Sequence, residues 1–151
     1  MLPDAETIRR TLATGGAYDA EVTVTALGVV VRTEASVVID ALAALSAEGY
    51  ESLMDLDGTD TGSAIELTYR FRSYQHGLEV FVKTVVPYDA EVASVWNLYP
   101  AALMPERETA ELFGLKLSGH PNPKRLLTTD GVPPLLRKNV AIRTREEVRR
   151  P

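Results

Sequence analysis

A chain of 151 residues, with 45% apolar and 25% charged residues, has the size and composition of one globular domain, or of one domain with a tail. The sequence contains no cysteine, which excludes disulfides, thiolate nucleophiles and cysteine-ligated iron–sulfur or zinc sites. The start of the chain lacks the basic and apolar regions of a signal peptide. The apolar stretches fall far short of the roughly 18 residues of a membrane-spanning helix. We therefore expect neither export nor a membrane span.

The net charge of −5 is unevenly distributed along the chain. Residues 1–113 hold 7 Lys/Arg and 18 Asp/Glu, whereas residues 114–151 hold 9 and 3. An acidic body followed by a basic arm is typical of an interaction tail, although a solvated charge run has the same composition. Such an arm could contact nucleic acid, anionic lipid or an acidic protein surface.

The first third of the chain predicts a helix, a hairpin and a second helix. Asp4–Thr14 carries apolar residues at helical spacing. Glu21–Thr25 and Gly28–Arg32 are short β-rich segments separated by a tight turn, which predicts a hairpin. An amphipathic helix follows, which we expect Thr33 to cap and Gly49 to end.

The middle third predicts three further strands. Glu51–Leu56 precedes a polar loop, Asp57–Ser63, and the segments Ala64–Phe71 and Leu78–Val86 alternate apolar and polar residues. Such alternation indicates a sheet with one buried face. The order of elements predicts a two-layer α+β fold, with helices packed on one face of a mixed, largely antiparallel sheet.

The last third of the sequence is rich in proline, since six of the nine prolines lie between residues 100 and 134. One helix is predicted here, with Pro105 at its first position and Gly114 just beyond its end. Arg107 and Glu111, four residues apart, can form an ion pair on this helix. We expect an α+β domain over residues 1–114 and an extended, basic, Pro-rich arm over residues 115–151.

The usual catalytic and binding motifs are not matched. The acidic segment from Asp55 to Glu66 has the length of a calcium loop, but Asp60 occupies the position that requires glycine. No glycine-rich phosphate loop, serine-hydrolase elbow or paired-histidine metal motif occurs. Glu106 and Glu108 point about 200° apart on a helix, so they cannot act together on one substrate.

A longer pattern lies between Glu106 and Lys138. Glu106-Arg107-Glu108 is followed at fixed spacings by an acid, two apolar residues, a histidine, a basic residue and two aliphatic residues. This order resembles the signature of the 30 kDa subunit of NADH:quinone oxidoreductase, respiratory complex I, and of the matching subunit in energy-converting membrane-bound hydrogenases. Similarity extends over roughly residues 20–139. The matching residues, which the resemblance implies to be signature and subunit-interface positions, are Glu106, Arg107, Glu108, Glu111, Phe113, Gly119, His120, Pro121, Lys124, Arg125, Leu136, Arg137 and Lys138.

Four positions depart from the family pattern. Glu111 replaces the usual aspartate, Met104 replaces a frequent tryptophan, and Asn139 with Val140 replaces Asp-Phe. The chain stops at Pro151, where many respiratory versions continue, and in this it is similar to the compact versions in hydrogenase-type complexes.

The resemblance implies a non-catalytic structural subunit that carries no cofactor. Its partners would be a large subunit with the quinone or nickel–iron site and a small subunit with iron–sulfur clusters. It would lie on the cytoplasmic side of the membrane and meet the membrane only through the complex. The residues leave two other classes open: a stand-alone α+β domain that binds a small molecule, and a nucleic-acid adaptor. The acidic body and the few aromatic residues argue against nucleic acid.

Overall fold

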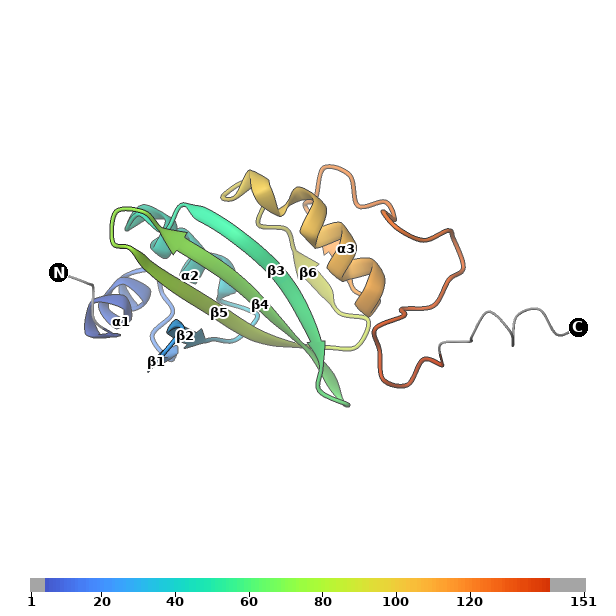
Figure 1. Ribbon diagram of the computed structural model, residues 1–151, viewed down its shortest axis with the longest axis horizontal. Helices are drawn as coiled ribbons and strands as arrows, with labels where there is room; N and C mark the ends of the chain where they lie inside the picture. The colour runs from blue at the N-terminus through green and yellow to red at the C-terminus, as the bar shows by residue number, and fades with distance from the viewer. Residues whose placement is uncertain (1–4, 142–151) are drawn as a thin grey trace, which may run out of the picture.

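The structure, a computed structural model, describes residues 5–141 (Figure 1). Within that range the helices are α1 (Ala5–Thr14), α2 (Val38–Ala47) and α3 (Leu103–Phe113), with a 3-10 turn, η1 (Pro100–Ala102), before α3. The strands are β1 (Glu21–Thr25), β2 (Gly28–Arg32), β3 (Ser52–Asp60), β4 (Ala64–Ser73), β5 (Leu78–Pro87), β6 (Glu91–Ala93) and β7 (Lys116–Ser118).

Five of the strands in the described range form one mixed sheet in the order β1-β2-β5-β4-β3. The β2–β5 pair is parallel, with Val31 opposite Val82, and the other pairs are antiparallel. Both the predicted α+β class and the predicted hairpin of β1 and β2 are confirmed. Figure 1 shows α1 and this hairpin at one end of the molecule and α3 at the other.

The two faces of the sheet differ in polarity, as the alternation predicts. On β4 every second residue is buried, from Ile65 through Phe71. These side chains share one core cluster with the apolar residues of α1 and α2. On the other face, Glu66 binds the Arg32 guanidinium at 2.8 Å and the Lys83 amine at 2.7 Å. Charged pairs of this kind suit a face that remains in contact with water.

Tyr99, just before η1 and α3, connects this part of the chain to α2 and the sheet. Its ring is fully buried against Phe71, with 4.6 Å between the ring centroids. Its hydroxyl lies 3.1 Å from the Leu42 carbonyl of α2 and 3.0 Å from the Tyr50 carbonyl. The chain that enters η1 and α3 is thereby fixed against α2 and the start of β3.

Helix α3 packs against β3 at a point where the strand has no side chain. A Cβ atom added to Gly58 would lie 2.6 Å from Cε2 of Phe113, so the ring occupies the space that any larger residue would need. One turn earlier, the Thr109 hydroxyl donates to the Leu56 carbonyl at 3.3 Å. These contacts set the position of α3 relative to the sheet.

Strand β3 is longer than the sequence predicts. The predicted loop, Asp57–Ser63, is wrong in its first half, because β3 continues to Asp60, which pairs with Ile65. Only Thr61–Ser63 forms the turn. An edge strand with one solvent-exposed face accepts polar residues, and the Asp57 carboxylate accepts the Gly58 N–H at 2.7 Å.

The predicted starts of α2 and α3 are also wrong. No side chain caps α2, which begins at Val38, so Thr33 is not its cap. Helix α3 begins at Leu103, directly after η1, and Pro105 is therefore its third residue. Proline is tolerated there because backbone N–H groups of the first turn have no partner within the helix. The predicted Gly114 beyond the end of α3 is confirmed, in a left-handed conformation with φ 72°.

One pairing was not predicted at all. Residues Lys116–Ser118, in the arm expected to begin at residue 115, form β7 and pair in parallel with β6. A strand of three residues carries too little periodicity to be recognised in a sequence. No helix among residues 5–141 is long and apolar enough to cross a membrane.

Candidate functional site

The residues of the signature pattern gather along α3 and the segment that follows β7. We call the described part of this segment, residues 119–141, the strap. Within these residues the strap contains neither helix nor strand. It passes back along α3 (Figure 1) and is fastened to it near the start, the middle and the end of the helix.

The first attachment uses His120, whose side chain is fully buried. Its Nε2 donates to the Leu103 carbonyl at 2.9 Å, and its Nδ1 accepts the Asn122 N–H at 3.0 Å. A ring that donates at Nε2 and accepts at Nδ1 is the neutral tautomer. Gly119, with φ 72°, takes the left-handed backbone conformation immediately before this histidine.

Glu106 lies beneath this attachment and is only 3% exposed. Its carboxylate accepts the Ser94 hydroxyl at 2.5 Å and the Val95 N–H at 2.6 Å, and lies 3.7 Å from His120 Nε2. Burial raises the pKa of Glu106, and the hydrogen bonds from Ser94 and Val95 only partly oppose this effect. Glu106 thus joins α3 to the segment after β6.

The second attachment begins with Arg107. Its Nε donates to the Lys124 carbonyl at 2.7 Å and its Nη2 to the Arg125 carbonyl at 2.9 Å. Arg125 in turn donates to the carbonyls of Thr129 and Val132. Both guanidinium groups therefore bind neutral backbone oxygens of the strap.

Glu111 completes the second attachment one turn further along α3. Its carboxylate accepts the N–H groups of Leu126, Leu127 and Thr128, as well as the Thr128 hydroxyl, with 2.6 Å to Leu126 and 3.0 Å to Leu127. Burial alone would raise the pKa of Glu111, but this set of donors outweighs burial and lowers the pKa to about 2. The predicted ion pair between the Arg107 guanidinium and the Glu111 carboxylate does not form in the structure, because both groups bind the strap backbone instead.

The third attachment is made by Arg137, which is 9% exposed. Its guanidinium donates to the Phe113 carbonyl at 2.6 Å, to the Gly114 carbonyl at 3.1 Å and to the Asp89 carboxylate at 3.0 Å. It also lies over the Tyr88 ring, 4.7 Å from the centroid. Arg137 therefore binds the last carbonyls of α3, groups that a helix leaves unpaired.

Asp60, at the end of β3, is a site residue that the sequence did not reveal. Its carboxylate accepts the Tyr88 hydroxyl at 2.6 Å, the Gly62 N–H at 2.8 Å and the Lys138 N–H at 2.7 Å. These hydrogen bonds, the one from Tyr88 first, lower the pKa of Asp60. Tyr88, Asp89, Ser94 and Thr128 were also missed, because each acts through a contact between residues distant in sequence.

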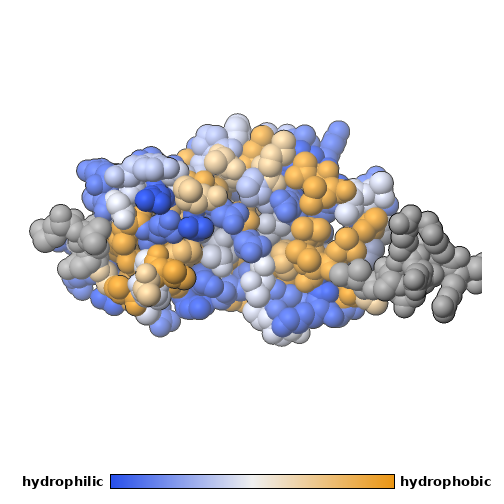
Figure 2. All heavy atoms as spheres, in the orientation of Figure 1, coloured by the Kyte–Doolittle hydropathy of each residue, from blue (hydrophilic) through white to orange (hydrophobic). Residues whose placement is uncertain are grey.

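Several predicted positions face outward. Glu108, Pro121, Lys124 and Lys138 are exposed. Leu136 is 48% exposed, and Leu127, in the middle of the strap, is 60% exposed. Figure 2 shows apolar residues gathered on this side of the molecule, over α3 and the strap.

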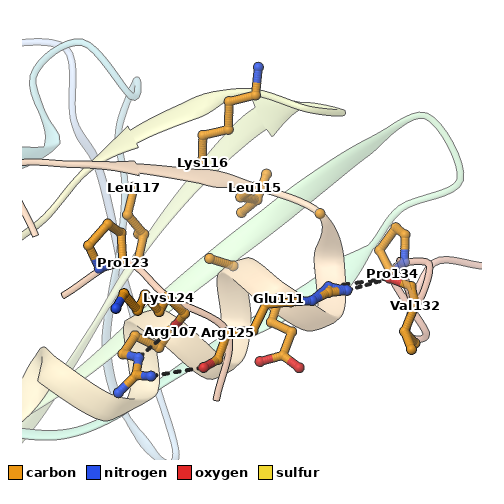
Figure 3. Close-up of a pocket in the computed structure, with 12 residues that line it drawn as sticks. Arg107, Glu111, Leu115, Lys116, Leu117, Pro123, Lys124, Arg125, Val132 and Pro134 are labelled. Carbon is orange, nitrogen blue, oxygen red and sulfur yellow. Dashed lines mark hydrogen bonds between the residues drawn. The ribbon is translucent and has the colours of Figure 1, made fainter. Parts of the chain in front are cut away.

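A hollow of about 430 Å³ lies between α3, β7 and the strap (Figure 3). Its lining residues are Arg107, Ala110, Glu111, Gly114, Leu115, Lys116, Leu117, Pro123, Lys124, Arg125, Val132 and Pro134. Within residues 5–141, no group of three or more histidine and acidic side chains is arranged to hold a metal ion.

Two solved structures share this fold. The membrane-bound sulfane sulfur reductase, an archaeal respiratory membrane complex, contains a chain with a TM-score of 0.68 and 26% identity, over 76% of this chain and 70% of that one. The trypsin-resistant fragment of Nqo5 has a TM-score of 0.63 and 25% identity, over 75% of this chain and 96% of the fragment.

Curated relatives are C subunits of NADH-quinone oxidoreductase. The protein of Methylobacterium sp. (strain 4-46) is 36% identical over 86 residues, which are 55% of this chain and 40% of the relative. The protein of Bartonella henselae is 34% identical over 83 residues, 53% of this chain and 41% of the relative. The similarity thus spans about two fifths of the length of these relatives.

The family model of the respiratory-chain NADH dehydrogenase 30 kDa subunit matches residues 30–146, a range that includes the main part of the sheet, α3 and the whole strap. Signature, fold and family model agree, and the chain belongs to the family of the 30 kDa subunit of respiratory-chain NADH dehydrogenase.

Proposed function

We propose that this chain is a non-catalytic structural subunit of the peripheral arm of a membrane-bound electron-transfer complex of the complex I type. Its partners would be the large subunit with the quinone site and the small subunit with iron–sulfur clusters, on the cytoplasmic side of the membrane. Redox centres would belong to those partners. The proposal is supported by the family and by relatives that are themselves subunits of NADH-quinone oxidoreductase.

The observation that carries the proposal is the way the strap is held. Arg107 binds the carbonyls of Lys124 and Arg125, and Glu111 binds the N–H groups of residues 126 and 127, so the middle of the strap is held by its backbone. The side chains of Leu127 and Leu136 consequently project outward from a fixed backbone. Exposed apolar groups on an ordered segment are typical of a surface that another protein covers.

The contacts also divide the predicted interface residues into two groups. Arg107, Arg125 and Arg137 bind carbonyl groups of this chain, which suits them to position the strap. The exposed leucines, together with Lys124 and Lys138, are the groups available to a partner. We therefore assign direct contact with other subunits to the second group.

A related complex type is the second candidate. Similarity to a chain of the membrane-bound sulfane sulfur reductase, an archaeal respiratory membrane complex, favours membership of a respiratory assembly other than complex I itself. The energy-converting hydrogenases, whose matching subunit the signature pattern also resembles, are such an assembly. The partner large subunit distinguishes these possibilities. Two pairs of CxxC cysteines that bind nickel would identify a hydrogenase, and a quinone site would identify complex I.

Gentle native purification of the tagged chain tests the proposal. We expect the wild-type chain to co-purify with other subunits, and a Leu127→Asp plus Leu136→Asp variant to melt like the wild type but to recover at least about tenfold less partner, because buried apolar contacts dominate such interfaces. Leu27→Asp, at an 80% exposed leucine of the distant hairpin, is the matched control and should assemble normally. Recovery of wild type as a lone monomer, or turnover by the isolated chain, would refute a structural role.

A further inference from the structure

We propose that Asp130, in the strap, is a site of spontaneous isomerisation to isoaspartate, and that this modification releases Arg125 from the strap. Aspartate isomerises when the backbone nitrogen of the next residue attacks its side-chain carbon, Cγ. Glycine in that next position favours the attack, because it has no Cβ to hinder the approach and few restrictions on its backbone. The chain contains two such pairs, Asp57-Gly58 and Asp130-Gly131, and the structure distinguishes them.

The reaction needs no cofactor and no oxidant. The Gly131 nitrogen forms a bond to Cγ of Asp130, and the hydroxyl of the protonated carboxyl group leaves with the amide hydrogen as water. The product is a succinimide ring. Water then adds to one of the two ring carbonyl carbons and breaks the bond from that carbon to nitrogen. Opening at Cγ restores aspartate, whereas opening at the α-carbonyl gives isoaspartate, whose main chain runs through Cβ and Cγ.

Asp130 and Gly131 form the centre of an exposed turn. One hydrogen bond of 3.3 Å closes this turn, from the Val132 N–H to the Thr129 carbonyl. Within residues 5–141, neither the Asp130 carboxylate nor the Gly131 N–H has a hydrogen-bond partner. A Cβ atom added to Gly131 would meet no other atom within 4 Å, so the surrounding space is open. The rotation about the Asp130 Cα–C bond that ring closure requires therefore disturbs only the turn and the contacts of Arg125.

The Asp57-Gly58 pair, in contrast, is held inside β3. The two residues lie opposite Thr68 and Leu67 of β4. The Gly58 N–H donates to the Asp57 carboxylate at 2.7 Å, and the Phe113 ring occupies the space beside Gly58. The same rotation here would separate β3 from β4 and from α3, so the reaction must wait for local unfolding. This pair is an internal control with the same dipeptide sequence.

Arg125 connects the two sides of the turn. Its Nε donates to the Thr129 carbonyl at 3.2 Å and its Nη1 to the Val132 carbonyl at 3.3 Å, and Figure 3 shows the contact with Val132. Asp130 lies between these two acceptors. Isoaspartate inserts one further main-chain atom there, and the rigid fork of a guanidinium cannot follow two acceptors that move apart. The modification should therefore free the Arg125 side chain.

Peptide mapping of the full chain, stored at neutral pH and body temperature, tests the first step. Mass spectrometry, with L-isoaspartyl methyltransferase to label isoaspartate, measures both Asp-Gly pairs in one sample. We expect isoaspartate to accumulate at least about tenfold faster at Asp130 than at Asp57, because the strand must open first. Asp130→Glu keeps the charge but would have to close a larger and less favourable ring, so it should abolish the signal at this position. Equal rates at the two pairs, or no isoaspartate at Asp130, would overturn the inference.

Limited trypsin digestion tests the release of Arg125, because the protease cleaves after an arginine only when the side chain can enter its specificity pocket. Chains with and without isoaspartate are separated and digested briefly under native conditions. We expect cleavage after Arg125 to be at least about tenfold faster in the modified chain, while cleavage after Arg10, exposed on α1, is unchanged. Repair of isoaspartate to aspartate by the methyltransferase should restore the slow rate. Equal cleavage after Arg125 in the two forms would refute the proposed release.

Discussion

Arg107 and Glu111 lie one turn apart on α3, and each binds the backbone of the strap instead of the other side chain. The Arg107 guanidinium offers only donors, so it takes the carbonyls of Lys124 and Arg125. Glu111, which offers only acceptors, takes the N–H groups that follow them. The two side chains together bind both kinds of backbone polar group in a segment that bends at residues 126–128, where three successive N–H groups converge on one carboxylate.

The first prediction concerns Glu111→Gln. A hydrogen bond to a charged group contributes about 1.5–3 kcal/mol, and the amide of glutamine replaces the charge and one acceptor oxygen. We expect the amide protons of Leu126, Leu127 and Thr128 to exchange with solvent at least about tenfold faster, while those of β4 are unchanged. Native-state hydrogen exchange measures both. Glu108→Gln, at an exposed position on the same helix, should leave all of these rates as they are.

The acid dependence of stability gives a second prediction, because Glu111 and Glu106 shift in opposite directions. The folded-state pKa of Glu111 is about 2, below the ordinary value of about 4.3, so its stabilisation is complete above that ordinary value. It is lost as the pH falls from there towards about 2. In the Glu111→Gln variant, the free energy of unfolding should therefore fall less as the pH drops through this range.

The pKa of Glu106 shifts in the opposite direction, because burial raises it. Its protonated form is favoured in the folded state, so stability declines as the pH rises from the ordinary glutamate value through the raised folded value. Glu106→Gln should remove that decline, since its amide oxygen can still accept the Val95 N–H. Urea unfolding midpoints from about pH 2 to about pH 7 test both variants. Parallel profiles for the two would contradict the assignment of the shifts.

The sequence was sufficient to predict the layers of the fold. The alternation in Ala64–Phe71 and Leu78–Val86 corresponds to buried and exposed faces of β4 and β5, and the hairpin of β1 and β2 lies where it was predicted. These features depend on local periodicity, which a single sequence displays directly. The end of β3 and the starts of α2 and α3 depend on tertiary contacts and were predicted wrongly.

The candidate site was predictable as a set of positions but not as a set of contacts. The signature places Glu106, Arg107 and Glu111 on one helix, and their spacing favoured a local ion pair. The partners they bind are backbone groups of residues eleven to eighteen positions away in sequence. Asp60 and Tyr88 act over still longer separations, and no pattern in the sequence indicates that a loop returns to them.

The third prediction concerns the contact between Gly58 and Phe113. An alanine at position 58 would place its Cβ 2.6 Å from the ring, and overpacking of this kind costs about 1–3 kcal/mol. Phe113→Leu removes part of the ring, so the double variant should lose less stability than the two single losses added together. Urea denaturation of the four proteins gives the coupling energy. Purely additive losses would show that α3 does not meet β3 at this point.

The final prediction separates Arg137 from Lys138, two adjacent signature residues. Arg137→Ala would leave the Phe113 and Gly114 carbonyls without their donor, and an unpaired buried polar group costs about 1–3 kcal/mol. Lys138 contributes its backbone N–H to Asp60 while its residue is exposed, so Lys138→Ala should melt like the wild type. Differential scanning calorimetry of the isolated chain measures these effects on stability. Co-purification then measures assembly, which we expect Lys138→Ala to weaken through lost charge at the interface and Arg137→Ala to weaken through a displaced strap. Normal melting of Arg137→Ala would mean that Arg137 does not hold the strap to the end of α3.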